Sequence, residues 1–298
     1  MSGRTPVAVD ADGNVRLPVG QVILRAQPRA LIVGTVTALA VLMAALVALA
    51  WGDYPLSVPQ VVQALLSDQG FATRVVTQWR LPRVIAAIAF GAALGASGAL
   101  FQTLTRNPLG SPDVIGFSTG AYTGAIVSLT VVGSNVLSEM AGALAGGLLT
   151  AALVYLLAWR GGIQGFLLII VGIAVTATLS SLNTYLLLRA QTEVAMAASL
   201  WGAGSLALID WGDVTLVVPA LALLGVVTAA MMGPLRQLEL GDDAAHAHGV
   251  RIEGTRITVL GAGVALIALV TAVTGPIAFI ALAAPQIARR LTRGAGIP

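Results

Sequence analysis

The densest group of side chains able to bind a metal lies in one short polar segment. There, Asp242 and Asp243 are followed by His246 and His248. Carboxylates and imidazoles are ligands of divalent metal ions. The same residues are also a common composition for a solvated loop, and no supporting groups around them are evident. We therefore expect no metal site and interpret these residues as part of a polar loop.

The side chains that the sequence lacks exclude several classes of enzyme. The chain contains no Lys and no Cys, and its two His are those just named. Without Lys it cannot form a Walker A phosphate-binding loop or a Schiff base. Without Cys it has no thiol nucleophile, thiolate metal ligand or disulfide. No acid–base constellation suggests an intramembrane enzyme, so we expect a protein with no catalytic residues and no cofactor of its own.

The composition indicates that lipid surrounds most of the chain. Of 298 residues, 57% are hydrophobic and only 10% are charged, whereas a soluble domain has about 25% charged residues. A helix needs about 20 apolar residues to cross the hydrocarbon core. Charge-free stretches occupy residues 30–52, 84–105, 114–138, 140–159, 161–188, 214–235 and 257–288.

Two features refine this count of membrane segments. Gly275-Pro276 divides the last stretch, because Pro ends the helix that precedes it. Residues 194–209 are short for a span and are typical of a re-entrant or interfacial helix. The sequence thus predicts an all-α integral membrane protein, a bundle of eight spanning segments with one additional short helix.

The arginines indicate the orientation of the chain. With a cytoplasmic N-terminus, 12 of the 16 basic residues fall in cytoplasmic segments, in agreement with the positive-inside rule. Residues 1–28 are mostly polar or mixed, and no convincing cleavage site follows the first apolar run. We therefore expect a cytoplasmic N-terminal segment rather than a signal peptide. The transmembrane domain is predicted to cover residues 29–298.

A secondary transporter is an alternative for a protein of this composition. Such carriers place ionisable side chains within the membrane, where they couple ion movement to transport. None of the charge-free stretches holds such a side chain, which disfavours this alternative.

Four motifs carry information beyond hydropathy. They are WRLPR at 79–83, RNPLGSPDVIG at 106–116, LELGDDAAHAHG at 238–249 and GPIAFIALAAPQIARR at 275–290. In this order and spacing they resemble the FecCD-type permeases, subunits of ATP-binding-cassette (ABC) importers for ferric siderophores, haem and vitamin B12. The resemblance runs from about residue 35 to the end of the chain. Within the family, residues 75–83, 157–162 and 200–206 are most similar to the ferric enterobactin permeases.

The resemblance implies a fold, a function and partners. The fold would be that of a type II ABC importer permease with ten membrane helices, of which this chain holds eight, so we expect its C-terminal part to be incomplete. The chain would pass an iron–siderophore complex from an extracytoplasmic binding protein to the cytoplasm by alternating access, with haem or cobalamin as alternative cargo. The implied partners are that binding protein, a second and homologous permease subunit, and two ATPase subunits that hold ATP and Mg²⁺. The implied location is the cytoplasmic (inner) membrane.

Two arginines are indicated as functional both by this resemblance and by a physical argument. Arg80 and Arg83 lie on the predicted outer side, against the positive-inside bias. Pro82 is well placed as the first residue of the second membrane helix, which would put Arg83 in a first turn where the helix dipole disfavours a cation. The resemblance implies that both arginines dock glutamates of the binding protein, and contact with lipid headgroups is the alternative.

The resemblance also assigns two sites on the cytoplasmic side. Asn107 and Leu109 would belong to the gate that closes the translocation path. Residues 234–256 would form the loop that couples the permease to the ATPase. The coupling residues within that loop would be Gly241, Asp242, Ala245 and Gly249.

Overall fold

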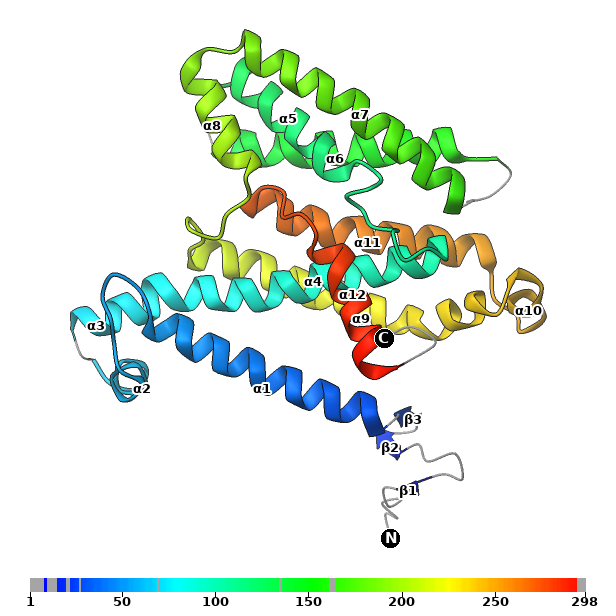
Figure 1. The fold of residues 1–298 in the computed structure, drawn as a ribbon, viewed down its shortest axis with the longest axis horizontal. Helices are drawn as coiled ribbons and strands as arrows, with labels where there is room; N and C mark the ends of the chain where they lie inside the picture. The colour runs from blue at the N-terminus through cyan, green and yellow to red at the C-terminus, as the bar shows by residue number, and fades with distance from the viewer. Residues whose placement is uncertain are drawn as a thin grey trace.

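The protein is described by a computed structural model that covers residues 8–9, 15–19, 22–26, 28–68, 70–133, 136–160 and 165–293. Nearly all of this is helical (Figure 1). The first helical elements in chain order are α1 (Pro28–Ala50), α2 (Val58–Leu66), α3 (Phe71–Arg74), the π-helical segment η1 (Val75–Arg80) and α4 (Leu81–Thr105). They are followed by α5 (Phe117–Val131), α6 (Val136–Ala158), α7 (Gly165–Arg189), α8 (Thr192–Gly202), α9 (Trp211–Glu239), α10 (Asp242–Ala247), α11 (Ile252–Thr274) and α12 (Ile280–Thr292).

A small antiparallel sheet precedes the helices, which the all-α prediction did not include. It consists of β1 (Ala8–Val9), β2 (Val15–Val19) and β3 (Val22–Ala26), and Val15 pairs with Ala26. The sequence of β2, VRLPV, alternates apolar residues with others, which is the period of a strand. Residues 1–28 are therefore not a uniformly polar segment, while the membrane part of the chain is helical as predicted.

Six of the described helices are long and apolar enough to cross a membrane: α1, the continuous helix Phe71–Thr105, α6, α7, α9 and α11. The other two predicted spans form shorter helices, α5 with 15 residues and α12 with 13. Both begin directly after a residue in a left-handed conformation, Gly116 and Phe279, and α5 also ends at Val131, before the end of the predicted stretch at residue 138. The predicted short helix is also present, as α8.

The loops divide into two ends of the bundle (Figure 1). At one, Arg80 contacts the end of α1, and Trp211 at the start of α9 contacts η1; we call this the Arg80 end. At the other, Arg106 after α4 contacts α9 and α10, and Arg29 in the first turn of α1 contacts α12; we call this the α10 end. The prediction that residues 53–80 and 236–256 lie on opposite sides agrees with this arrangement.

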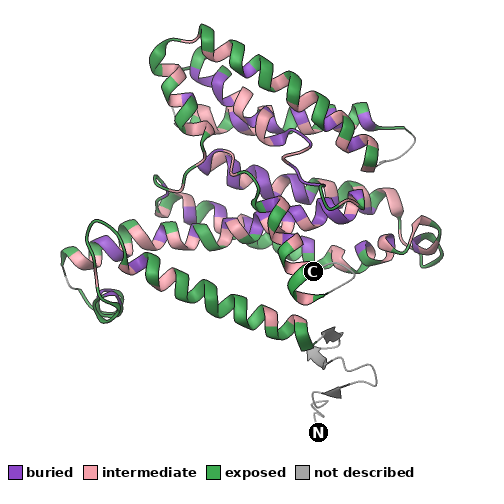
Figure 2. Ribbon diagram, viewed as in Figure 1, coloured by how far each residue is buried: buried purple, intermediate pink, exposed green. Residues whose placement is uncertain are grey.

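The core of the bundle surrounds α4 and α11, each of which carries more buried residues than any of the other described helices (Figure 2). Ser97 of α4 donates a hydrogen bond of 2.6 Å to the carbonyl of Gly263 in α11. Gly98 lies so close to the backbone of Ala281 that a Cβ atom would clash with it, which brings α12 against α4. By contrast, Leu49 is the only buried residue of α1, as expected for an outer helix that faces lipid.

Glycines allow α5 and α6 to pack closely against each other. A Cβ on Gly124 would clash with the carbonyl of Gly142, and one on Gly146 would clash with the carbonyl of Gly120. Such contacts suit membrane helices, where close van der Waals packing replaces the hydrophobic effect.

Candidate functional sites at the two ends of the bundle

The helix that carries the two outer arginines begins earlier than predicted. It runs without interruption from Phe71 to Thr105, so Pro82 is inside it and not at its start. The π-helical turn accommodates the proline, because the Leu81 N–H bonds to the Val76 carbonyl instead of that of Thr77. The indole N–H of Trp211 donates to this Thr77 carbonyl at 2.8 Å.

This extended helix changes the argument for Arg83. The residue lies about three turns after the helix start, where the dipole of the first turn no longer acts. The dipole therefore does not make Arg83 unusual, and its position against the positive-inside bias remains the physical reason to assign it a function.

Arg80 binds the end of α1 within the chain. Its guanidinium donates to the carbonyls of Leu49 at 2.8 Å, Ala50 at 3.3 Å and Tyr54 at 2.7 Å. Two of these carbonyls belong to the last turn of α1, where no further helical N–H is present to satisfy them. A Cβ at Gly52 would lie 2.6 Å from the guanidinium, so Gly leaves the space that it occupies. Arg80 thus serves as a C-cap for α1.

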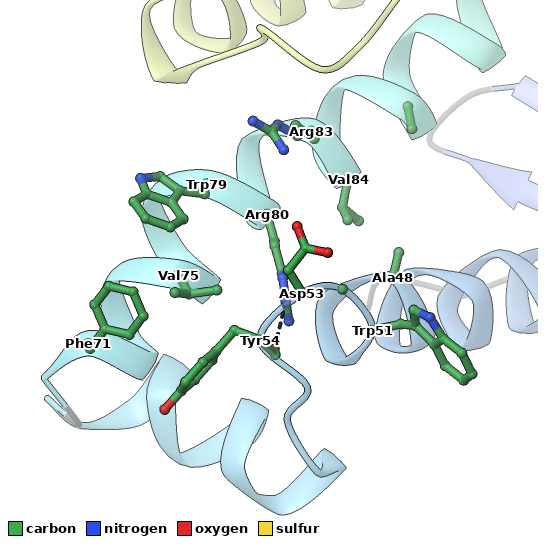
Figure 3. Close-up of a pocket in the computed structure, with 12 residues that line it drawn as sticks. Ala48, Trp51, Asp53, Tyr54, Phe71, Val75, Trp79, Arg80, Arg83 and Val84 are labelled. Carbon is green, nitrogen blue, oxygen red and sulfur yellow. Dashed lines mark hydrogen bonds between the residues drawn. The ribbon is translucent and has the colours of Figure 1, made fainter.

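Arg83 lines a cavity of about 560 Å³ at the same end (Figure 3). Its side chain points away from that of Arg80, and no hydrogen-bond or ion-pair partner for it is found among the described residues. Aromatic rings form one wall, where Phe71 packs edge-on against Tyr54 and Trp79. Aromatic and arginine side chains are enriched where proteins bind partners, so this cavity can receive an acidic group.

At the α10 end, α4 ends in a hairpin that spans residues 106–116. The Asn107 N–H bonds to the Gln102 carbonyl and the Arg106 N–H to the Thr103 carbonyl, a Schellman motif that places its left-handed residue at Arg106, with φ 49°. The Asn107 side chain accepts a 2.8 Å hydrogen bond from the Leu109 N–H. Asn107 therefore shapes the hairpin, while the side chain of Leu109 is 62% exposed.

The hairpin is tied to the predicted coupling loop by an ionic cluster. Arg106 contacts the carboxylate of Asp242 at 3.0 Å and also donates to the Leu238 carbonyl at 2.7 Å. Arg256 of α11 approaches both oxygens of Asp242, at 2.9 and 2.8 Å. Asp242 was predicted as a coupling residue, but neither arginine partner was, since the two arginines stand 136 and 14 residues away from it.

The other predicted coupling residues shape α10. Gly241 and Gly249 have φ values of 115° and 78°, which non-glycine residues rarely adopt. Ala245 is completely buried within the chain, so it holds α10 against the bundle. The surface that α10 presents outward consists of other residues, including His246 and His248. Within the described ranges, no group of three or more metal-ligating side chains is close enough to hold an ion.

A group of exposed hydroxyl residues lies in the second half of α7. Thr178, Ser181 and Thr184 are exposed there, and each hydroxyl donates to the carbonyl four residues before it. Asn183 of the same helix instead faces α5, where its Nδ2 donates to the Thr119 carbonyl at 3.3 Å; it is 4% exposed, and its Oδ1 has no hydrogen-bond partner in the described part of the chain. α7 is long and apolar enough to span the membrane, and it nevertheless exposes several hydroxyl groups.

Comparison with known proteins identifies the family. Ferric enterobactin transport system permease protein FepG of Escherichia coli is 47% identical over 262 residues, which cover 86% of this chain and 79% of FepG. Achromobactin transport system permease protein CbrC of Dickeya dadantii is 35% identical over 85% of this chain and 74% of CbrC. Among solved structures, an inward-facing metal-chelate type ABC transporter aligns with a TM-score of 0.77 and 26% identity over 88% of this chain and 82% of that one. Residues 38–296 match the FecCD transport family, and the chain belongs to this family.

Proposed function

We propose that the chain is the transmembrane permease subunit of an ATP-driven importer for an iron–siderophore complex. The observation that carries this proposal is the 47% identity to the ferric enterobactin permease over most of both chains. The CbrC match, to a permease for another iron chelator, supports the same class of cargo. Six long apolar helices agree with a multi-pass protein of the cytoplasmic membrane.

The α10 end is proposed to face the cytoplasm and bind an ATPase subunit. Basic residues are concentrated at this end, including Arg106, Arg236 and Arg256, and the positive-inside rule favours the cytoplasm for them. The exposed side of α10 would contact the ATPase, with Gly241 and Gly249 fixing its backbone. ATP and Mg²⁺ would be held by the ATPase and not by this chain.

The Arg80 end would then face an extracytoplasmic binding protein. Arg83 has no partner among the described residues and lines an open cavity, so it is suited to pair with a glutamate of the binding protein. A guanidinium can bind a carboxylate through two parallel hydrogen bonds, which fixes orientation as well as attracting the partner. Arg80 contributes mainly by holding the cavity wall in place.

The hydroxyl surface of α7 would line the path of the cargo. Exposed hydroxyl groups gain nothing from contact with lipid tails, whereas a water-filled path can solvate them. A second, homologous permease subunit facing α7 would enclose such a path, with the two subunits forming a heterodimer. Asn107 and Leu109 at its cytoplasmic mouth would close when the outer mouth opens, as alternating access requires.

Uptake in a strain that lacks this chain tests the proposal and its cargo. Ferric enterobactin, a ferric hydroxamate, haem and cobalamin are supplied separately, and uptake is measured with and without the restored chain. We expect restoration to recover uptake of the catecholate, ferric enterobactin. Recovery of haem or cobalamin alone would contradict the iron–siderophore assignment, and recovery of none would contradict the permease function.

A further inference from the structure

The Arg106–Asp242 contact joins two parts of the chain that have separate proposed functions. One is the hairpin of residues 106–116, which carries the gate residues. The other is α10, which is proposed to bind the ATPase. The Arg106 Nη2 atom donates both to the Leu238 carbonyl in the last turn of α9 and to the carboxylate in the first turn of α10. The guanidinium is therefore bound where α9 passes into α10.

Arg256 fixes the orientation of the carboxylate that Arg106 contacts. The Arg256 side chain is only 18% exposed and meets both oxygens of Asp242. The Asp242 and Arg106 side chains are 46% and 50% exposed, so solvent screens their attraction and the pair adds little to global stability. Its importance is then positional, because it connects three elements: the hairpin, α10 and α11.

The backbone of Arg106 supports this interpretation. The residue occupies the left-handed position of the Schellman motif, with φ 49°, where Gly is the usual residue because it has no Cβ. Arginine is disfavoured at this position by backbone conformation alone. The side chain, and not the turn, therefore accounts for an arginine here.

We propose that Arg106 and Asp242 form a link through which movement of α10 on the ATPase is passed to the hairpin at the cytoplasmic mouth. The proposal rests on the proposed function and assigns Arg106 as a positioning residue. When the ATPase displaces α10, the carboxylate carries the guanidinium with it, and the hairpin follows because Arg106 is its first residue. Arg256 keeps the carboxylate aligned with α11 during this movement.

The chain offers a variant that separates the link from folding. Arg106→Gly removes the guanidinium and at the same time places the preferred residue in the left-handed position, so the end of α4 is retained. Since the chain has no Cys, Leu109→Cys in the hairpin and His246→Cys in α10 provide a unique pair of spin-label sites. Their distance distribution is measured in the full chain in lipid nanodiscs. We expect a narrow distribution in the parent and one at least about twice as wide in Arg106→Gly and in Asp242→Asn.

Asp243→Asn is the matched control for the distance measurement. Asp243 stands in the same first turn of α10, is exposed, and has no ion-pair partner among the described residues. Asp243→Asn removes the same charge from the start of α10 as Asp242→Asn does, but it leaves the Arg106–Asp242 contact intact. Its distance distribution should therefore equal that of the parent. An unchanged distribution in Arg106→Gly, or an equal widening in Asp243→Asn, would overturn the proposal.

The second readout is the amount of ferric enterobactin imported per ATP hydrolysed by the complete importer in proteoliposomes. In Arg106→Gly we expect ATP hydrolysis to continue while this ratio falls at least about fivefold, the lower range of typical coupling between sites. Arg106→Lys keeps the charge and should recover part of the ratio. Arg290→Ala, which removes an exposed arginine of α12, should leave the ratio unchanged.

These measurements distinguish failure of the link from failure of the proposed function. If Arg106→Gly widens the distance distribution but leaves the import per ATP unchanged, the Arg106–Asp242 contact is only structural, and the proposed link is overturned. A parent importer that hydrolyses ATP without importing ferric enterobactin would contradict the proposed function instead, and the link would fall with it.

Discussion

The two ends of the bundle hold their arginines in different ways. At the Arg80 end, one guanidinium binds only neutral main-chain carbonyls, and Arg83 has no partner among the described residues. The cavity there is lined by these two arginines and by a single acidic residue, Asp53, and no ion pair joins the three side chains in the described part of the chain. At the α10 end, Arg106 and Arg256 share the carboxylate of Asp242.

This difference indicates two modes of partner recognition. An arginine that has no ion-pair partner among the described residues can attract an acidic partner and orient it. Where arginines are already paired, charge contributes less to binding, and recognition depends on the shape of the exposed backbone and side chains. We therefore infer electrostatic docking at the Arg80 end and docking by shape at the α10 end.

The largest expected effect is on the shape of α10. Gly241→Val forces a β-branched residue into φ 115°, a strain of about 1–3 kcal/mol, and α10 should tilt away from its position. We expect transport-linked ATP turnover in the complete importer to fall about tenfold or more, with membrane insertion and binding-protein association intact. Gly225→Val is the control, because Gly225 lies within α9 with no atom near its Cβ position. Normal turnover in Gly241→Val would contradict docking by shape.

Charge reversal at Arg83 should have the next largest effect. Arg83→Glu replaces attraction by repulsion toward an acidic partner, and a charge-assisted hydrogen bond contributes about 1.5–3 kcal/mol. We expect binding-protein association at low salt to weaken about tenfold or more, and a Glu→Arg change on the partner to restore part of it.

Arg74→Glu is the matched control for that variant. Arg74 is exposed at the same end but does not line the cavity. Equal weakening by both variants would indicate a general effect of charge, and no weakening by either would leave contact with lipid headgroups as the role of Arg83.

Substitution of Arg80 should have a smaller effect, and it should lower the stability of the fold more than the association with the binding protein. Arg80→Lys keeps the charge but cannot reproduce the planar fork that meets the carbonyls of Leu49 and Tyr54. We expect a loss of about 1–2 kcal/mol, seen as a melting temperature lower by a few degrees, with association of the binding protein reduced less than in Arg83→Glu. A larger loss of association than in Arg83→Glu would show that Arg80 is the main docking residue.

The smallest predicted effect concerns Asp113 in the 106–116 hairpin. Its carboxylate has no arginine partner among the described residues. Burial raises the pKa of this carboxyl above its ordinary value of 3.8, and a hydrogen bond from Ser118 offsets part of the rise. Between the ordinary and the raised pKa the folded chain binds more protons than the unfolded chain, so stability falls as the pH rises through that window.

Asp113→Asn has no charge to bury and removes this dependence. We expect its melting temperature to exceed that of the parent by about 1–3 °C at neutral pH, with the difference vanishing below the ordinary pKa. A difference that is constant with pH would indicate that the carboxyl is not responsible.

Hydropathy was sufficient to predict the membrane helices, because lipid requires long apolar segments wherever the chain crosses. It overestimated α5 and α12, because composition does not show where a helix starts and ends: left-handed residues at Gly116 and Phe279 delay the start of each, and α5 ends early at Val131. The π-helical turn before Pro82 depends on a carbonyl that Trp211 satisfies from another helix, and no local pattern encodes that contact.

The site residues could likewise be predicted from the sequence, but their contacts with distant parts of the chain could not. The resemblance, together with the positive-inside rule, singled out Arg80 and Arg83, but only the fold distinguishes them, since the α1 end binds one and not the other. Asp242 was included without its partners, because the hairpin and α11 meet it only after folding. Gly241 and Gly249 were included on resemblance, and the structure provides the physical reason in their positive φ values.

Association of both partners with the full chain in nanodiscs, measured over one salt titration, tests the comparison most directly. The Debye length decreases from about 10 Å at 0.1 M to about 3 Å at 1 M ionic strength, so charge attraction is screened across this range. We predict that the binding protein dissociates as salt rises, that salt no longer weakens its association in Arg83→Glu, and that ATPase association changes little. Equal salt dependence of the two partners, or a dependence that persists in Arg83→Glu, would contradict the account.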